Sequence, residues 1–279
     1  MINIAVLVLI LAVVMVFIWR RPIGQLPASK SEDRVLESVA AAEDDELMLF
    51  YHKDPQPERL VGLWARWAGH AYKAASPWSV FPPAIGFFSV VFREHPEWIE
   101  RLLPSWLDDR SAVAIDAALA LSGNSAIRQQ MQARFAKSGA NQMLKDELGA
   151  LPSEALDIQI ATPTHLDILW GAFFASGDER YVRRIIEFLA QTADRSELIA
   201  IDIANVNLAM AGGPNEIIGQ LKEKYAQSFA GTIAYAATAA WALGANATRH
   251  EKVAHAIEAY MSEHPATHTT KVLSVIGPR

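Results

Sequence analysis

The chain has 279 residues, a net charge of −6 and no cysteine. It is long enough to bury a sizeable core, and the lack of cysteine excludes disulfides and thiolate metal sites. Residues 32–58 hold nine acidic and two basic side chains, residues 1–31 carry +3, and residues 59–279 are left near neutrality at −2. A domain without a basic field cannot neutralise phosphates, so we exclude nucleic acid as a partner.

Sixteen apolar residues run without a charge from Ile4 to Trp19, and residues 1–19 are predicted to form a single transmembrane anchor. Twelve of the sixteen are Leu, Ile, Val or Phe, which together favour insertion by about 4 to 7 kcal/mol. No Lys or Arg precedes this run, and Trp-Arg-Arg-Pro follows it where a cleaved signal peptide has small residues. The segment is therefore interpreted as a retained anchor and not as a signal peptide.

The basic residues near the anchor predict its orientation. Arg20, Arg21 and Lys30 follow the apolar run, and none precedes it. Positive charge favours the cytoplasmic side. We therefore expect a single-pass protein of an inner or plasma membrane with its C-terminal domain in the cytoplasm.

Residues 20–58 are predicted to be a juxtamembrane linker and an acidic helical segment. Residues 20–33 are polar and contain Pro and Ser, as linkers do. Ser29 and Glu32 form a possible capping box for a helix over 32–50. From residue 59 onward no window alternates strictly between apolar and polar residues, so the fold class is predicted as all-α.

The clearest segment is a helical hairpin over residues 163–190. Its first helix carries an apolar stripe at spacings of three and four residues, and Thr164 with Asp167 reads as a capping box at its start. Ser176-Gly177-Asp178 then predicts a turn, and a second helix follows. The stripe consists of Leu166, Leu169, Trp170, Phe173 and Phe174.

The hairpin pattern recurs with a shift of 35 residues, giving further hairpins at 197–227 and 231–262. Two less regular hairpins are expected at 82–103 and 111–136, with inserted material at 138–160. Over roughly 80–262 the chain resembles tetratricopeptide- or HEAT-like repeat proteins in period and pattern. The resemblance implies a solenoid-like repeat domain over 59–279, whose stacked hairpins would present a surface for a protein partner.

Five of the eight tryptophans lie between Trp64 and Trp106. Trp64 and Trp67 share a helical face, while Arg66, His70 and Lys73 lie on another. A basic, Trp-bearing amphipathic helix close to an anchor suits an anionic membrane surface or a partner. The alternative is that these aromatic residues fill the core of the first repeats.

Asp202 and Asn205 are polar residues in the otherwise apolar stretch 198–211, as is Asn207. Unpaired polar groups buried there would cost about 1 to 3 kcal/mol each. Two interpretations therefore stay open, a hydrogen-bond network between helices or the lining of a binding surface. Asp202 also occupies the place in its hairpin that Asp167 has in the preceding one.

No nucleotide, nucleophile-elbow or zinc-protease motif occurs, and the histidine spacings fit no metal site. No catalytic residue, metal ligand or cofactor is predicted. The leading hypothesis is a membrane-anchored scaffold or assembly factor at a bacterial-type membrane. The alternatives are an enzyme acting on a membrane or envelope substrate in a helical cleft, and a lipid-surface-binding module.

Overall fold

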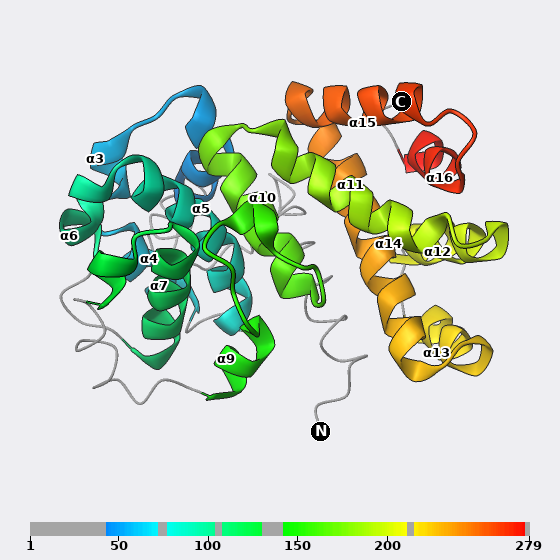
Figure 1. Cartoon of the computed structure of the whole chain (residues 1–279), viewed down its shortest axis with the longest axis horizontal. Coiled ribbons are helices and arrows are strands. Elements are labelled where there is room, and N and C mark those ends of the chain that lie inside the picture. The colour runs from blue at the N-terminus through cyan, green and yellow to red at the C-terminus, as the bar shows by residue number, and fades with distance from the viewer. Residues whose placement is uncertain (1–42, 72–76, 104–107, 130–141, 211–214, 277–279) are drawn as a thin grey trace, which may run out of the picture. The chain divides into compact units, whose positions relative to one another are not determined.

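The computed structural model describes residues 43–71, 77–103, 108–129, 142–210 and 215–276. Helices and the turns between them account for all of these residues, and no strand occurs among them (Figure 1). The all-α class predicted from the sequence is therefore confirmed for this part of the chain.

The anchor predicted at Ile4–Trp19 and the linker that follows it lie outside the described residues. Within the described ranges, no helix combines the length and the apolar character needed to cross a bilayer. The longest of them, α14 (Gln227–Ala247), has 21 residues.

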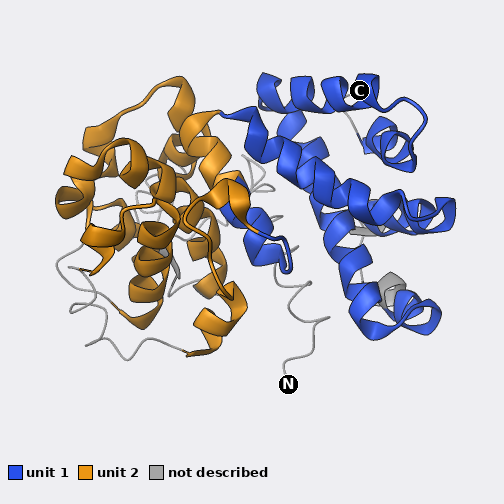
Figure 2. Cartoon of the chain, viewed as in Figure 1, with its two compact units in different colours: residues 1–13, 159–169, 178–279 blue, residues 14–158, 170–177 orange. Residues whose placement is uncertain are grey.

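The described residues fall into two compact units (Figure 2). Unit 2 contains those within 43–158 and 170–177, and unit 1 contains those within 159–169 and 178–276. One helix, α10 (Pro163–Ser176), contributes residues to both.

In unit 2, residues 43–50 are helical, and the helices that follow are short apart from two. Their bounds are η1 Tyr51–Lys53, α3 Pro57–Leu60, α4 Leu63–Ala71, η2 Pro77–Val80, α5 Phe81–Glu94, η3 Pro96–Trp98, α6 Ile99–Leu102, α7 Asp109–Leu121, α9 Gln142–Leu148 and η5 Ala155–Asp157.

Helix α5 forms the core of unit 2 because it is apolar on almost every side. Eleven of its 14 residues are buried, and it packs along α7. The second half of α10 crosses it at Gly171, where an added Cβ would lie 1.9 Å from the carbonyl oxygen of Pro83. Only glycine allows this approach.

Unit 1 is built around α14. The other helices that lie wholly in this unit are α11 Glu179–Ala193, α12 Glu197–Met210, α13 Asn215–Lys224, α15 Glu251–Glu263 and α16 His268–Ile276. All five pack against α14. Alanine predominates among the buried residues of α14, and these small side chains let the neighbouring helices approach closely. At Gly244 the approach is closest, since an added Cβ would lie 2.5 Å from the carbonyl oxygen of Ile276.

The three clearest hairpins of the sequence correspond to the helix pairs α10–α11, α12–α13 and α14–α15. The predicted first turn is present, with Gly177 at a φ of +63° and Asp178 capping α11. The start of α10 differs from the expectation. Pro163 is its first residue, a position that proline favours, so Thr164 lies inside the helix and not before it.

Contacts in unit 1 reach beyond neighbouring hairpins. In a one-dimensional stack each hairpin touches only the next. Here α11 packs on α12 and also on α14, α15 and α16, while α12 packs on α16. Helix α16, in a segment without a repeat signature, closes this bundle.

Candidate functional site

Trp64 and Trp67, expected at a membrane or partner surface or in the core, lie in the core of unit 2. Their exposed fractions are 1% and 5%. The Trp64 ring stacks on Phe88 at a centroid distance of 4.7 Å, and the Trp67 ring meets the same phenylalanine edge-on at 5.9 Å. Helix α5 supplies this phenylalanine, so α4 turns its tryptophan face inward. We therefore place both rings in the core and not on a binding surface.

Arg66 is engaged within the fold. Its Nε donates to Oδ2 of Asp44 at 2.7 Å, and a second guanidinium nitrogen donates to Oδ1 at 3.0 Å. The same group also donates to the backbone oxygens of Val61 and Arg59. Arg66 thereby ties helix 43–50 to the α3–α4 turn. His70 belongs to α4, and Lys73 lies outside the described residues.

Asp202 joins α12 to the end of α13. Its Oδ2 accepts from the Lys224 ammonium and from the Tyr225 hydroxyl, each at 2.6 Å. The Asp202 side chain is 15% exposed, so the contacts lie at the edge of the surface. Burial, followed by the hydrogen bond to Asp202, raises the pKa of Tyr225, and the hydrogen bond to Asp202 raises the pKa of Lys224.

The two asparagines of α12 take opposite sides of the helix. Asn207 is buried, and its Nδ2 donates to the backbone oxygen of Ala237 in α14 at 3.4 Å. Asn205 is exposed. Of the two interpretations of this stretch, an inter-helix hydrogen bond describes Asn207, whereas Asn205 is on the outer surface.

Beside Asn205 the outer face of α12 is apolar. Leu198 and Ile201 are 53% and 50% exposed, and they are three residues apart, so they are neighbours on the helix surface. Leu198 is also one turn before Asp202 on the same helix, which places it beside the polar contacts to α13.

An aromatic pair contacts two residues near this face, because Tyr225 binds Asp202 and Phe229 lies against Arg195. The rings of Tyr225 and Phe229 meet edge-on with their centroids 5.5 Å apart. The Arg195 guanidinium lies 5.1 Å from the centroid of the Phe229 ring, and both rings are half-buried. We call the resulting patch the α12 surface. It consists of Arg195, Leu198, Ile201, Asp202, Asn205, Tyr225 and Phe229.

Sequence reasoning found Asp202 and Asn205 but missed the apolar and aromatic members of the α12 surface. A signal for Leu198 and Ile201 was present, because α12 is apolar on more sides than a core-facing helix requires.

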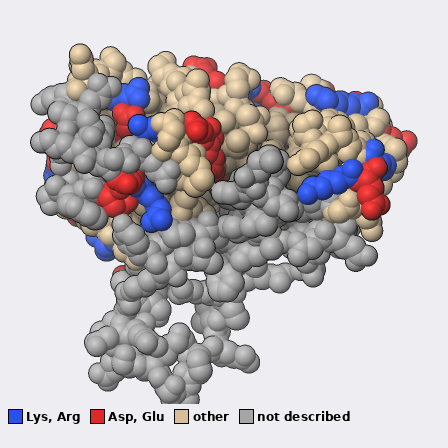
Figure 3. Space-filling view, turned by 90° about the horizontal axis from the view of Figure 1, so that it is seen from below, with Lys and Arg blue, Asp and Glu red and all other residues tan. Residues whose placement is uncertain are grey.

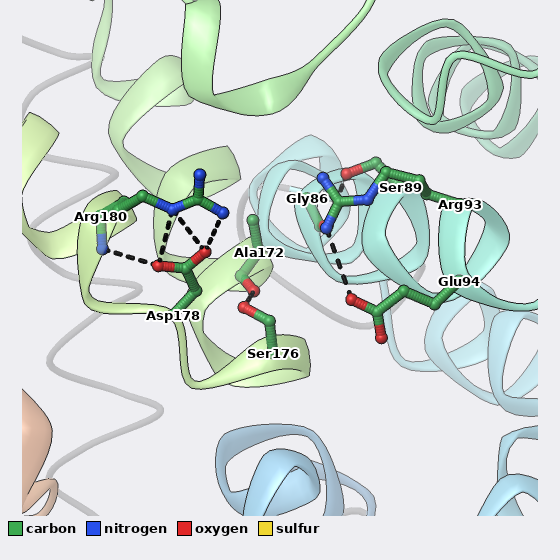
Figure 4. A network of polar contacts seen from close by, with 8 residues as sticks. All are labelled: Gly86, Ser89, Arg93, Glu94, Ala172, Ser176, Asp178 and Arg180. Carbon is green, nitrogen blue, oxygen red and sulfur yellow. Dashed lines mark hydrogen bonds and ion pairs between the residues drawn. The ribbon is translucent and has the colours of Figure 1, made fainter.

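The polar contacts drawn in Figure 4 are local. Figure 4 shows Asp178 holding Arg180 at the start of α11, and, in unit 2, Ser89 bonded to Gly86, Arg93 paired with Glu94 and Ser176 bonded to Ala172. All join residues at most four apart and stabilise helix turns or ends. Asp167, considered as an equivalent of Asp202, is buried in α10.

Charged side chains of both signs are interspersed over the described part of the face in Figure 3. Among the described residues, no three His, Asp or Glu side chains are grouped so as to hold a metal ion.

No protein-family model matches the sequence, and neither the curated proteins nor the solved structures include a significant match. The resemblance to tetratricopeptide- and HEAT-like proteins therefore rests on the period of the sequence and on the helical hairpins alone.

Proposed function

We propose that the protein is a membrane-tethered scaffold or assembly factor that docks a protein partner on the α12 surface. The observation that carries the proposal is the pair Leu198 and Ile201, both about half exposed, on the helix whose Asp202 binds Tyr225 of the aromatic pair Tyr225–Phe229. Aromatic and aliphatic side chains that stay partly exposed next to polar groups are typical of protein interfaces.

Contacts within the protein itself hold several side chains of the α12 surface in position. Asp202 binds Lys224 and Tyr225, and Tyr225 in turn contacts Phe229. Because these side chains are already fixed, little conformational entropy is lost when they bind, and this favours affinity.

The repeat-like organisation of residues 163–262 supports the same function. Three pairs of helices follow one another in this range, close to the spans that a shift of 35 residues predicts, although α14 begins at Gln227 and not at 231. We infer that they are copies of one hairpin unit. Arrays of such units serve as binding surfaces, and this analogy of fold supports docking.

The tether is the apolar segment Ile4–Trp19, and we propose that it crosses an inner or plasma membrane with the helical units in the cytoplasm. Its support is the sequence alone, through sixteen uncharged apolar residues followed by Arg20 and Arg21. Carbonate extraction of membranes tests the anchor, and an extracted protein would contradict it. A reporter at Arg279 that matures only outside the cytoplasm would contradict the orientation.

Docking is tested by site-specific photocrosslinking of the full-length protein in its own membranes. A photoreactive residue replaces Ile201 in one version and Val275 in a control, because Val275 is also an exposed aliphatic residue of unit 1, at 46% exposure. We expect one discrete adduct from position 201 that mass spectrometry identifies as a single protein, and none of that mass from position 275.

A second variant separates docking from chance proximity. With the photoreactive residue kept at position 201, Leu198→Glu should abolish the adduct, because it puts a charge into an apolar contact. Circular dichroism checks that the helices of the variant remain. An adduct that survives Leu198→Glu, or that forms equally from position 275, would overturn the proposal.

A further inference from the structure

Two ion pairs on the surface of unit 1 join α11 to α15. The Nδ1 of His255 lies 2.9 Å from Oε2 of Glu179, 76 residues away in sequence. Arg183, one turn further along α11, pairs with Glu263 at the end of α15. Both pairs are exposed, and the helices beneath them pack together.

The two pairs differ in chemistry. Arginine keeps its charge at every pH that a folded protein experiences, whereas histidine changes its charge near neutrality. The Arg183–Glu263 pair is therefore present throughout the physiological range. The Glu179–His255 pair is an ion pair only while the imidazole holds its second proton.

The carboxylates near His255 favour that proton. Glu179 faces it from α11, and Glu251 and Glu258 act on it from α15 itself. Two further helices pack on α15. Of these, α14 has no charged residue, and α16 offers His268 and Lys271, the latter paired with Glu197 at 3.2 Å.

We propose that Glu179 and His255 form an acid-strengthened clasp that holds α15 on α11 more firmly as the imidazole becomes protonated, while Arg183–Glu263 holds it independently of pH. The clasp changes the free energy of local opening of α15. Because both partners are on the surface, the buried core of unit 1 is unaffected.

The direction of the pH dependence follows from the pKa. The hydrogen bond to Glu179, and then its negative charge, raise the pKa of His255 above the usual 6.5. A group whose pKa is higher in the folded state adds stability that is complete below its unfolded pKa and is lost as the pH rises through the folded value. The attachment of α15 should therefore weaken as the pH rises above 6.5 and through the raised pKa of His255.

The first measurement is the pKa of His255 in the full-length protein in detergent micelles, by NMR titration after ¹³C labelling of histidine. His255→Gln assigns the resonance among the eight histidines. We expect a pKa above 6.5 that falls in Glu179→Gln. An unshifted pKa, or one that does not respond to Glu179→Gln, would overturn the proposal.

The second measurement is hydrogen exchange of the α15 amides at pH 6 and pH 8, corrected for intrinsic exchange rates. We expect protection at pH 6 to be greater by about 1.5- to 5-fold, the range for an exposed ion pair. Glu179→Gln and His255→Gln should remove the difference. Arg183→Gln is the matched control and should lower protection equally at both values, and a pH difference that persists in His255→Gln would refute the clasp.

Discussion

The carboxylate of Asp194 accepts a hydrogen bond at 2.8 Å from the backbone N–H of Thr269, 75 residues later in the chain. Asp194 follows the last residue of α11, and Thr269 is in the first turn of α16. The N–H groups of a first turn have no partner within their own helix. A carboxylate just beyond the end of α11 therefore caps α16, and its charge also suits the positive end of the helix dipole.

Removal of this cap should loosen α16. Asp194→Ala is expected to cost about 0.5 to 2 kcal/mol, the usual range for a lost cap. Hydrogen exchange of the α16 amides measures the loss. The control is Glu197→Ala, which breaks only the exposed pair with Lys271 and should cost less than about 1 kcal/mol. Protection of the α16 amides that is unchanged in Asp194→Ala would show that Asp194 is not a cap.

Two glycines of α14 should respond in opposite ways to alanine. Gly244→Ala forces a methyl group against the Ile276 carbonyl and should destabilise unit 1 by about 1 to 3 kcal/mol. Gly231→Ala meets only the Tyr235 ring, at 3.9 Å, and should stabilise the helix by about 0.5 to 1 kcal/mol. Urea unfolding followed by circular dichroism compares them, and losses of the same size would contradict the close contact of α14 with α16.

Arg66 should be a structural residue and not a lipid contact. Arg66→Ala leaves the buried Asp44 carboxylate without its partner and should cost about 1 to 2 kcal/mol in the stability of unit 2. Arg59→Ala removes an exposed contact to Gln56 and should change stability by less than about 0.5 kcal/mol. Unfolding of both variants measures this. Liposome binding that falls in Arg66→Ala with unchanged stability would favour the membrane interpretation instead.

Asp202 should control the titration of Tyr225. Asp202→Asn removes the negative charge that the Tyr225 hydroxyl binds, so the pKa of that hydroxyl should move down towards its usual 10.0. Part of the rise should remain, because burial is its largest cause. Ultraviolet titration detects the shift, with Tyr225→Phe identifying this tyrosine among six. A pKa unchanged in Asp202→Asn would mean that the hydrogen bond does not form in solution.

The helical hairpins could be predicted because their signals are local. The apolar stripe of α10 and the Ser176-Gly177-Asp178 turn are both contained within a few helical turns. The contacts between hairpins could not be predicted in this way. The cap of α16 by Asp194 spans 75 residues, and nothing near Thr269 in sequence indicates it.

At the candidate site, too, local features could be predicted from the sequence, whereas contacts between distant residues could not. The helical face that bears Trp64 and Trp67 predicts that these side chains are covered. The sequence pattern does not tell whether lipid, a partner or the protein's own α5 covers them. The contact of Asp202 with Lys224, however, could have been predicted from the sequence. Asp202 and Lys224 are equally far in sequence from residue 213, and antiparallel helices of a hairpin bring such residues together.

The alanine-rich α14 also determines where the helices that pack on it lie. Each turn of an α-helix holds 3.6 residues, so inserting one residue rotates everything beyond it by about 100°. Because α11, α12, α13, α15 and α16 all pack on α14, such a rotation would turn Gly244 away from Ile276 and misalign the contacts of α14 with several helices at once. Length changes in this helix should therefore be far less tolerated than substitutions on the outer face of α12.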